Sequence, residues 1–355
     1  MNAGVSSRRQ RGHRVSGVRR AFRAPPAARR LEPGPVPTFT VVIAAHNAAG
    51  TIAEAVESAL VQTLPALEII VCDDGSTDAT AAALEPYGER LKYIRKERGG
   101  AASARNAALE HAYGDFFAVL DADDAYLPQR LEALAELAVV RRDLDIICTD
   151  AFFEVDSRIV GRFGEVCPFE IADQRSAIFE RCFCAWPAVR RTMLVEAGGF
   201  DESLRTGSDW ECAIRLVHRG AVAGVIDEPL YRYRLHERSV TADRVRTLGD
   251  RVVLLERIRQ TYELHGGERV ALARSLTRQR ASLALTEAEA ALRARSRNAR
   301  SYAFAAARTR GVGLRSRLAA LAAALAPRAA ARTLERRDAH GGGSRLRRSL
   351  ERGAA

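Results

Sequence analysis

The sequence predicts an α/β fold: a mostly parallel, twisted sheet flanked by helices, followed by a C-terminal α-helical extension. Short β-branched runs alternate with helical stretches between residues 38 and 150, which is typical of repeated strand–helix–strand units. From about residue 246 only helical patterns rich in Ala, Leu and Arg remain. Polar side chains follow several predicted strands, and ligands of such sheets bind at the carboxyl ends of the strands.

The predicted elements follow one another at short intervals. Residues 39–45 are predicted to form the first strand. The pair Thr51 and Glu54 predicts a capping box at the start of the next helix. Further strands are predicted at 67–72, 91–94, 116–120 and 145–149, with helices near 78, over 101–111 and over 128–140. The second half predicts a helix over 191–197 ending at Gly198-Gly199, a helix from about 209, and strands at 222–226 and 231–235.

The positive charge lies at the two ends of the chain. Of the formal net charge of +11, residues 1–40 carry +8 and residues 291–355 carry +13, which leaves −10 for residues 41–290. Basic ends suit anionic partners such as membrane phospholipid or nucleic acid, but a solvated, partly disordered Arg-rich end explains them better. No nucleic-acid partner is expected, because aromatic residues do not interleave with the arginines.

We divide the chain into four parts. Residues 1–37 are expected to be a disordered basic leader, 38–245 the α/β domain, 246–340 a helical extension and 341–355 a flexible basic tail. The six cysteines lack zinc-site spacing and are expected to be reduced and mostly buried. Without a signal-peptide or membrane-spanning pattern, we expect a cytoplasmic protein, with peripheral contact at the inner membrane face as an alternative.

The segment Asp121-Ala122-Asp123 directly follows a predicted strand. Carboxylates at positions i and i+2 can converge where the chain turns, and hard oxygen ligands suit Mg²⁺ or Mn²⁺ bridging to a diphosphate. The same pattern also recurs in ordinary turns and helix caps. Its place after a buried strand, with Asn47 and Asp73-Asp74 at two other strand ends, favours a binding site.

The acidic pair Asp73-Asp74 opens a run that continues to Asp78. A carboxylate here can accept the imide N–H of a uracil or thymine ring. The same residues could instead form an Asx-turn, with Ser76 or Thr77 capping the next helix. Taken alone, the run leaves both interpretations open.

Together, the motifs of residues 38–240 resemble the family-2 glycosyltransferases, whose catalytic domain has the type-A glycosyltransferase fold. They are residues 41–47 (VVIAAHN), 68–78 (EIIVCDDGSTD), 99–100 (GG), 104–106 (ARN), 120–124 (LDADD), 128 (P), 130–132 (RLE), 198–202 (GGFDE), 208–211 (SDWE) and 231–236 (YRYRLH). The resemblance implies a nucleotide-diphospho-sugar transferase with residues 38–245 as its catalytic domain. It would move a sugar from a UDP-, dTDP- or GDP-linked donor to a glycan, lipid-linked or small-molecule acceptor, as in polysaccharide or cell-surface glycan synthesis.

The resemblance also implies roles for single residues. Asp74 would contact the nucleobase with Asp73 beside it, and Arg105 would contact the donor together with Asn47 at the first strand end. Asp121 and Asp123 would bind the diphosphate and a divalent metal, Mn²⁺ or Mg²⁺, with His236 as a further metal ligand.

Asp209 matches the general base of inverting members, which would take a proton from the acceptor hydroxyl as that oxygen attacks the anomeric carbon. Without the resemblance, the N-cap of the helix that includes Trp210 explains Asp209 better. Trp186 is a candidate stacking platform for a sugar, or a core residue beside Pro187.

Two departures from the family pattern concern specificity. Ala44 and His46 stand where the family usually has Pro and Tyr, so the nucleobase is not assigned, and Ser208 replaces a common Glu next to Asp209. A sugar-phosphate nucleotidyltransferase is an alternative, but residues 45–50 lack the basic residues its loop needs. A second alternative is a non-catalytic nucleotide- or membrane-binding module, but that function does not explain the three aspartates at 121, 123 and 209.

Overall fold

The structure is a computed structural model that describes residues 35–339 apart from 170–171, 237–238 and 240–242. Most of the predicted leader, residues 1–34, and the whole predicted tail, residues 341–355, lie outside the described residues. The proposed boundary between the α/β domain and the extension stays a prediction.

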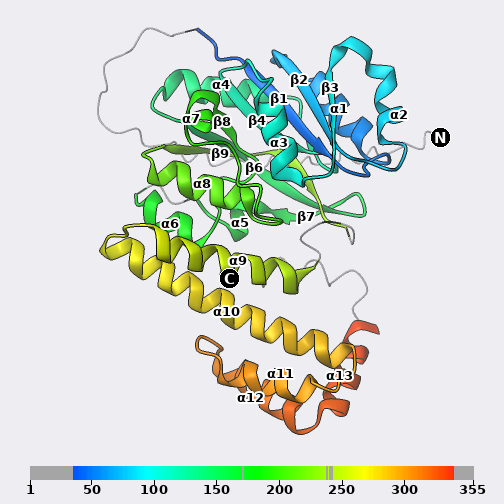
Figure 1. The fold of residues 1–355 in the computed structure, drawn as a ribbon, viewed down its shortest axis with the longest axis vertical. Coiled ribbons are helices and arrows are strands. Elements are labelled where there is room, and N and C mark those ends of the chain that lie inside the picture. The colour runs from blue at the N-terminus through cyan, green and yellow to red at the C-terminus, as the bar shows by residue number, and fades with distance from the viewer. Residues whose placement is uncertain (1–34, 170–171, 237–238, 240–242, 340–355) are drawn as a thin grey trace, which may run out of the picture. The chain divides into compact units, whose positions relative to one another are not determined.

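Strands and helices alternate through the first part of the chain, and the described residues from 244 to 339 form helices alone (Figure 1). The strands are β1 (Phe39–Ala45), β2 (Glu68–Asp74), β3 (Lys92–Lys96), β4 (Phe116–Asp121), β5 (Ala125–Tyr126), β6 (Ile146–Val155), β7 (Arg158–Arg162), β8 (Ala188–Arg190) and β9 (Ala223–Arg234). The helices are α1 (Ile52–Leu60), α2 (Thr80–Leu84), the 3₁₀ helix η1 (Glu85–Arg90), α3 (Ala101–Leu109), α4 (Arg130–Val140), α5 (Phe163–Val166), α6 (Gln174–Glu180), α7 (Arg191–Glu196), α8 (Ser208–His218), α9 (Arg244–Thr261), α10 (Gly266–Arg293), α11 (Ala299–Arg308), α12 (Leu314–Leu325) and α13 (Pro327–Ala339).

The strands form one sheet in the order β3-β2-β1-β4-β8-β6-β9-β5, with β7 paired to β6. The strands β3, β2, β1 and β4 are mutually parallel. Beyond β4 the sheet is mixed, because β8 runs antiparallel to both β4 and β6 whereas β6 and β9 are parallel. The α/β class with a helical C-terminal region is confirmed, and the predicted parallel pairing holds for the first four strands.

Apolar side chains cover both faces of the sheet. Val41 and Ile43 of β1 are fully buried on one face, in a cluster that includes residues of α1 and α4. Val42 of the same strand is buried on the other face, in a cluster with α3, α6, α7 and α8. Leu254 of α9 and Leu272 of α10 belong to that second cluster. The first two helices of the C-terminal region therefore complete the core of the sheet domain.

The last helices have an alanine-rich core of their own. Residues of α10, α11 and α12 form it, among them the fully buried Ala303 and Ala306. Alanine faces let helix backbones approach closely, which suits a compact helical cluster. Among the described residues, none of the helices combines the length and the apolarity that a membrane crossing requires.

Two local predictions are wrong. Thr51 precedes α1 without capping it, and its hydroxyl points back to the carbonyl of Ala48 at 3.4 Å. The carboxylate of Glu54 pairs with Arg232 and Arg234 of β9, so a tertiary ion pair replaces the expected capping box. The two strands predicted at 222–226 and 231–235 are one strand, β9, whose register with β6 shifts around residue 150.

We predict that Gly114→Ala destabilises the fold, because a Cβ at residue 114 would lie 2.4 Å from the backbone nitrogen of Thr40 in β1. Overpacking of this kind costs about 1–3 kcal/mol of unfolding free energy, measured by urea denaturation. Gly249→Ala is the control, because nothing lies within 4 Å of a Cβ there. Within helix α9 that change should stabilise by about 0.5–1 kcal/mol. Equal stability of wild type and Gly114→Ala would contradict the close β1 contact.

Candidate active site

The parallel strands bring the predicted site residues to one edge of the sheet. Ala45 at the end of β1 pairs with Asp73 of β2, and Ala44 pairs with Asp121 of β4. Because the three strands run in the same direction, the segments that follow them leave the sheet on the same side. Asn47, Asp74 and the acidic segment after Leu120 therefore lie along one rim.

Asp73 is fully buried and stabilises the turn after β2. Its carboxylate accepts hydrogen bonds from the backbone N–H of Ser76 (2.8 Å) and from the hydroxyl of Tyr93 (2.7 Å). Burial alone would raise the pKa of Asp73, but these hydrogen bonds outweigh it and lower that pKa. Burial and the bond to Asp73 raise the pKa of Tyr93 to about 12. In this structure Asp73 therefore holds the turn after β2 against Tyr93 of β3.

Asp74 is also engaged within the protein. Its side chain accepts the backbone N–H groups of Gly99 (2.7 Å) and Gly100 (2.6 Å), and Lys96 Nζ lies 3.1 Å away. Only 3% of the residue is exposed. A nucleobase would have to compete with the Gly99-Gly100 segment for this carboxylate. The contact between Asp74 and a nucleobase stays a prediction, and it requires that the nucleobase replace the amides of Gly99 and Gly100.

Asn47 joins the loops after β1 and β2. Its backbone has a positive φ of 52°, and its N–H donates to Ser76 Oγ at 2.9 Å. Its side-chain carbonyl accepts the N–H of Thr77 at 2.8 Å. The ring of His46 lies 2.9 Å from the carbonyl oxygen of Asp74. These bonds couple the loops along the rim.

A pocket beside the end of β4 brings together Arg105, Asp121, Trp186 and Asp209. Its other lining residues are Val119, Ile146, Pro187, Val189, Phe200, Cys212, Ala213 and Leu216. Arg105 of α3 donates to Asp121 Oδ1 at 2.7 Å and is only 8% exposed. Burial lowers the pKa of this guanidinium, but the carboxylates of Asp121 and Asp209 outweigh the burial and raise it. The pocket therefore combines two carboxylates with a buried cation in an apolar wall.

Asp209 lies in the first turn of α8 but does not cap it. The helix begins at Ser208, and the N-cap position belongs to Gly207, which has a positive φ of 77°. The capping role considered for Asp209 is therefore wrong. Its side chain is exposed and lines the pocket that Asp121 also lines.

Trp186 is both a pocket wall and part of an aromatic cluster. Its indole N–H donates to Asp121 Oδ2 at 3.2 Å. Its ring stacks on Tyr231 with centroids 4.7 Å apart and lies 4.8 Å from the ring of Tyr233. The aromatic packing supports the interpretation as a core residue, and a sugar-stacking role of Trp186 stays a prediction.

Asp123 and His236 meet at the outer side of the same acidic segment. The His236 Nε2 atom lies 2.8 Å from Asp123 Oδ2, and each side chain is about one third exposed, at 38% and 34%. Burial and the neighbouring Asp121 raise the pKa of Asp123, although His236 lowers it in part. Asp124, which the sequence did not single out, is fully buried and accepts the hydroxyl of Tyr231.

The pair Asp123 and His236 is the candidate site for a divalent cation. The imidazole of His236 lies next to the carboxylate of Asp123, and both side chains are partly exposed. They fit Mn²⁺ or Mg²⁺ that takes its remaining ligands from water and phosphate oxygens. Asp121 would first have to exchange its bonds to Arg105 and Trp186. Within the described ranges, no three His, Cys, Asp or Glu side chains are placed to hold a metal by themselves.

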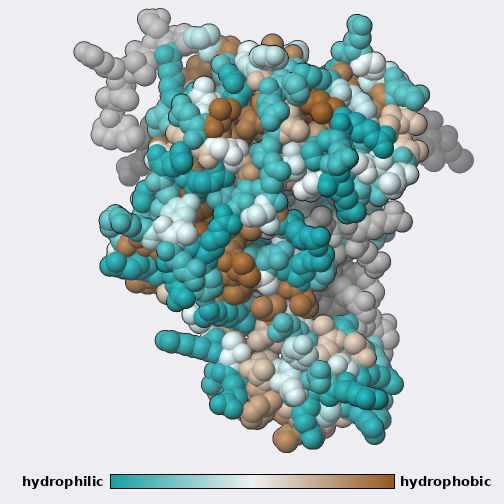
Figure 2. Space-filling view, viewed as in Figure 1, coloured by the Kyte–Doolittle hydropathy of each residue, from teal (hydrophilic) through white to brown (hydrophobic). Residues whose placement is uncertain are grey.

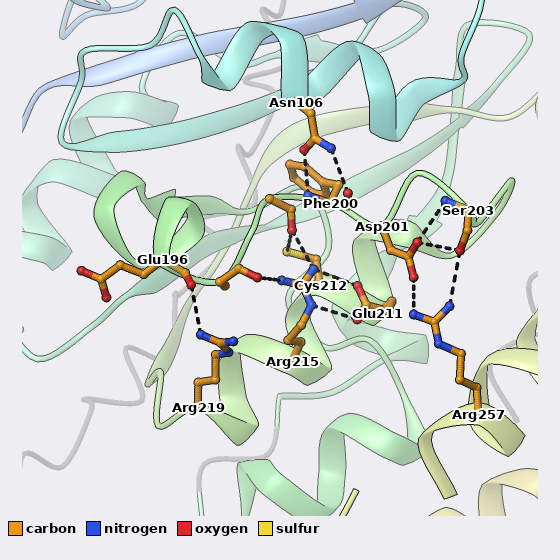
Figure 3. Close-up of polar contacts among 12 residues, drawn as sticks. Asn106, Glu196, Phe200, Asp201, Ser203, Glu211, Cys212, Arg215, Arg219 and Arg257 are labelled. Atoms are coloured by element: carbon orange, nitrogen blue, oxygen red, sulfur yellow. Dashed lines mark hydrogen bonds and ion pairs between the residues drawn. The ribbon is translucent and has the colours of Figure 1, made fainter. Parts of the chain in front are cut away.

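The loop after α7 forms the wall opposite β4, and side chains from α3 and α9 fix it (Figure 3). Asn106 of α3 accepts the N–H of Phe200 at 2.8 Å and donates to its carbonyl at 2.9 Å. Arg257 of α9 pairs with Asp201. The guanidinium of Arg105 lies 5.6 Å from the centre of the Phe200 ring, so this loop supports the pocket.

Arg215 of α8 fixes the other side of the loop (Figure 3). It donates to the carbonyls of Ala197 and Gly199, both at 2.6 Å, and to both carboxylate oxygens of Glu211 at 2.9 Å. Glu211 and Arg215 are mostly buried, with side chains 7% and 17% exposed. Arg215 therefore joins the loop to the helix that carries Asp209. Arg215 was not predicted from the sequence, because a lone arginine within a helix carries no signal of these contacts.

We predict that Arg215→Met lowers the unfolding free energy by about 3 kcal/mol, because it leaves the buried Glu211 and two carbonyls without their partner. Urea denaturation measures the change. Arg141→Met is the matched control, since Arg141 and its partner Asp143 are 42% and 56% exposed and the pair should contribute less than about 1 kcal/mol. Similar losses for the two variants would show that Arg215 does not fix the loop.

The sheet and its flanking helices have the type-A glycosyltransferase fold. The TarS fragment 1–349 of S. aureus, in complex with UDP-GlcNAc, aligns with a TM-score of 0.56 at 19% identity, covering 86% of this chain and 92% of that one. The mannosyltransferase PcManGT of Pyrobaculum calidifontis, in complex with GDP-Man and Mn²⁺, aligns with a TM-score of 0.54 at 23% identity, covering 85% and 84%. At these identities the likeness concerns the fold.

Residues 40–198 match the model of Glycosyl transferase family 2, so this part of the chain is similar to that family. The succinoglycan biosynthesis protein ExoO of Rhizobium meliloti is 32% identical over 237 residues, which is 58% of this chain and 63% of that protein. The chain spans 66% or less of the length of the first curated relatives that it matches.

Proposed function

We propose that the protein is a glycosyltransferase that moves a sugar from a nucleoside-diphosphate donor to an acceptor hydroxyl with inversion at the anomeric carbon. The observation that carries this proposal is the pocket that Asp121 and Asp209 line together with the buried Arg105, which pairs with Asp121. The match of residues 40–198 to the model of Glycosyl transferase family 2 supports the reaction class.

The mechanism is a single displacement. The acceptor oxygen forms a bond to the anomeric carbon while the bond from that carbon to the diphosphate oxygen breaks. Asp209 takes the hydroxyl proton as the new bond forms, and the nucleoside diphosphate leaves. The buried cation of Arg105 balances the negative charge of Asp121 beside the departing group and limits repulsion between the two carboxylates.

A divalent cation would be bound by Asp123 and His236, with Asp121 as a third ligand after it releases Arg105 or Trp186. When bound, it would neutralise charge on the leaving diphosphate. The Mn²⁺ in the PcManGT structure supports metal use in this fold.

The relatives support a choice of donor and acceptor class. The structural neighbours were solved with UDP-GlcNAc and with GDP-Man, which supports a UDP- or GDP-linked sugar, with dTDP as a further candidate. The succinoglycan relative supports a growing polysaccharide as acceptor, ahead of a lipid-linked or small-molecule one. Asn47 and Arg105 are proposed donor contacts, and Asp73 and Asp74 form the proposed nucleobase end of the site.

We expect Asp209→Asn to lower kcat by a factor of about 10²–10⁴, because the amide cannot accept the acceptor proton. Turnover is measured as nucleoside diphosphate release in the presence of acceptor, and circular dichroism verifies folding. Asp143→Asn, at an exposed ion pair away from the pocket, is the control and should retain wild-type turnover. A folded Asp209→Asn enzyme with near wild-type kcat would exclude Asp209 as the base.

Mn²⁺ together with UDP or GDP should raise the melting temperature of the wild type. At a hundredfold excess over Kd the stabilisation is about 2.7 kcal/mol, which corresponds to a shift on the order of 5 °C or more. Asp123→Asn and His236→Ala should each lose most of the Mn²⁺-dependent part of the shift. His111→Ala, an exposed histidine beyond the end of α3, should keep it. A full shift in Asp123→Asn would place the metal elsewhere.

A further inference from the structure

The segment from residue 291 to residue 334 contains ten arginines and no acidic residue. The arginines are Arg293, Arg295, Arg297, Arg300, Arg308, Arg310, Arg315, Arg317, Arg328 and Arg332. Two of them pair with acidic residues outside the segment, Arg293 with Glu289 and Arg295 with Glu335. The segment includes all of α11 and α12, so this end of the helical region is strongly positive.

Helix α12 also exposes a stripe of leucines. Leu314, Leu318 and Leu325 are 73%, 57% and 79% exposed. Their spacings of four and seven residues place them on one side of the helix. The opposite side, with Ala320 and Ala323, is buried against the alanine-rich cluster of α11. The leucines are therefore not needed for the packing of α12 within the protein.

Basic residues flank this stripe. Arg310 precedes α12 and Arg315 lies in its first turn, both exposed, and within the described part of the chain neither is seen in an ion pair. Helix α11 adds Tyr302 and Phe304, which are 41% and 48% exposed. In Figure 2, brown and tan atoms interleave with teal ones in the lowest part of the view, where Figure 1 places α11 and α12.

We propose that α12 and the loop before it dock on an anionic lipid bilayer, with Leu314, Leu318 and Leu325 inserted among the lipids and Arg310 and Arg315 on the headgroup phosphates. An amphipathic helix with apolar residues on one side and arginines beside them binds in the plane of such an interface. The proposal is independent of the proposed function, because it concerns where the chain binds and not what it transfers.

Other occupants fit the surface less well. A second copy in a two-fold contact would bring the same arginines of both chains together, which is repulsive. Nucleic acid would use the arginines but would leave the leucine stripe in water. A bilayer with anionic headgroups satisfies both features of the surface at once.

The test is flotation of the full chain with vesicles of phosphatidylcholine alone or with about 30% phosphatidylglycerol, a composition that attracts juxtamembrane basic residues. Wild type should bind the anionic vesicles and not the neutral ones. The triple variant Leu314→Gln, Leu318→Gln, Leu325→Gln keeps the charge and should bind the anionic vesicles at least about tenfold more weakly. The pair Val253→Gln, Val270→Gln, at exposed valines of α9 and α10, is the matched control and should bind as wild type.

A second variant tests the contribution of the arginines to vesicle binding. Arg310→Gln with Arg315→Gln should weaken binding by roughly twentyfold, since each arginine near an anionic surface contributes about a factor of five. Arg158→Gln with Arg246→Gln, at exposed arginines of β7 and α9, should have little effect. The single change Leu325→Gln, at the most exposed of the three leucines, keeps the test valid if the triple variant is unfolded.

Three results would overturn the proposal. Wild-type affinity of a folded leucine variant would show that the basic ends bind vesicles by charge alone. Equal binding of wild type to neutral vesicles would remove the role of the arginines. A leucine variant that changes oligomeric state in ultracentrifugation, with vesicle binding intact, would assign the surface to contacts between copies.

Discussion

The buried ion pair between Arg105 and Asp121 is the interaction on which the candidate site depends. A guanidinium that is 8% exposed is stable only with anionic partners, and the carboxylates of Asp121 and Asp209 supply them. The pair also binds the carboxyl end of β4 to helix α3, while Phe200 covers the arginine from the loop after α7. One contact between segments far apart in the sequence therefore balances the charges in the pocket and holds its lining residues together.

The rest of the domain keeps that contact in place. Parallel pairing of β1 with β2 and β4 fixes which residues leave the sheet together. Asn106 and Arg215 then fix the loop after α7 through backbone bonds, so that the loop position does not depend on a ligand. Helix α9 contributes Arg257 to the same loop, and Leu254 of α9 packs in the core beneath α8. The first helix of the C-terminal region is therefore part of the framework of the site.

Much of this could be predicted from the sequence, because it depends on local patterns. The first strand was predicted with the bounds of β1, and the strand-end rule placed Asp73, Asp121 and Asn47 on one rim. What could not be predicted depends on contacts across the chain. The amides that occupy Asp74 lie 25 and 26 residues later. Strand β8, whose antiparallel pairing makes the sheet mixed, has three residues and too short a pattern to detect. Glu54 does not form the predicted capping box, because its carboxylate pairs with arginines of β9. Here a tertiary contact outweighs the local preference.

The central claim is that a nucleoside diphosphate binds along the acidic rim, with its reacting end facing the pocket between Asp121 and Asp209. A crystal structure of the protein with UDP or GDP and Mn²⁺ tests this most directly. We predict that the diphosphate lies against Asp123 and His236, and that the carboxylate of Asp209 faces its terminal phosphate across the space a sugar would fill. A nucleotide bound elsewhere, or an Asp209 side chain turned away from it, would contradict the account.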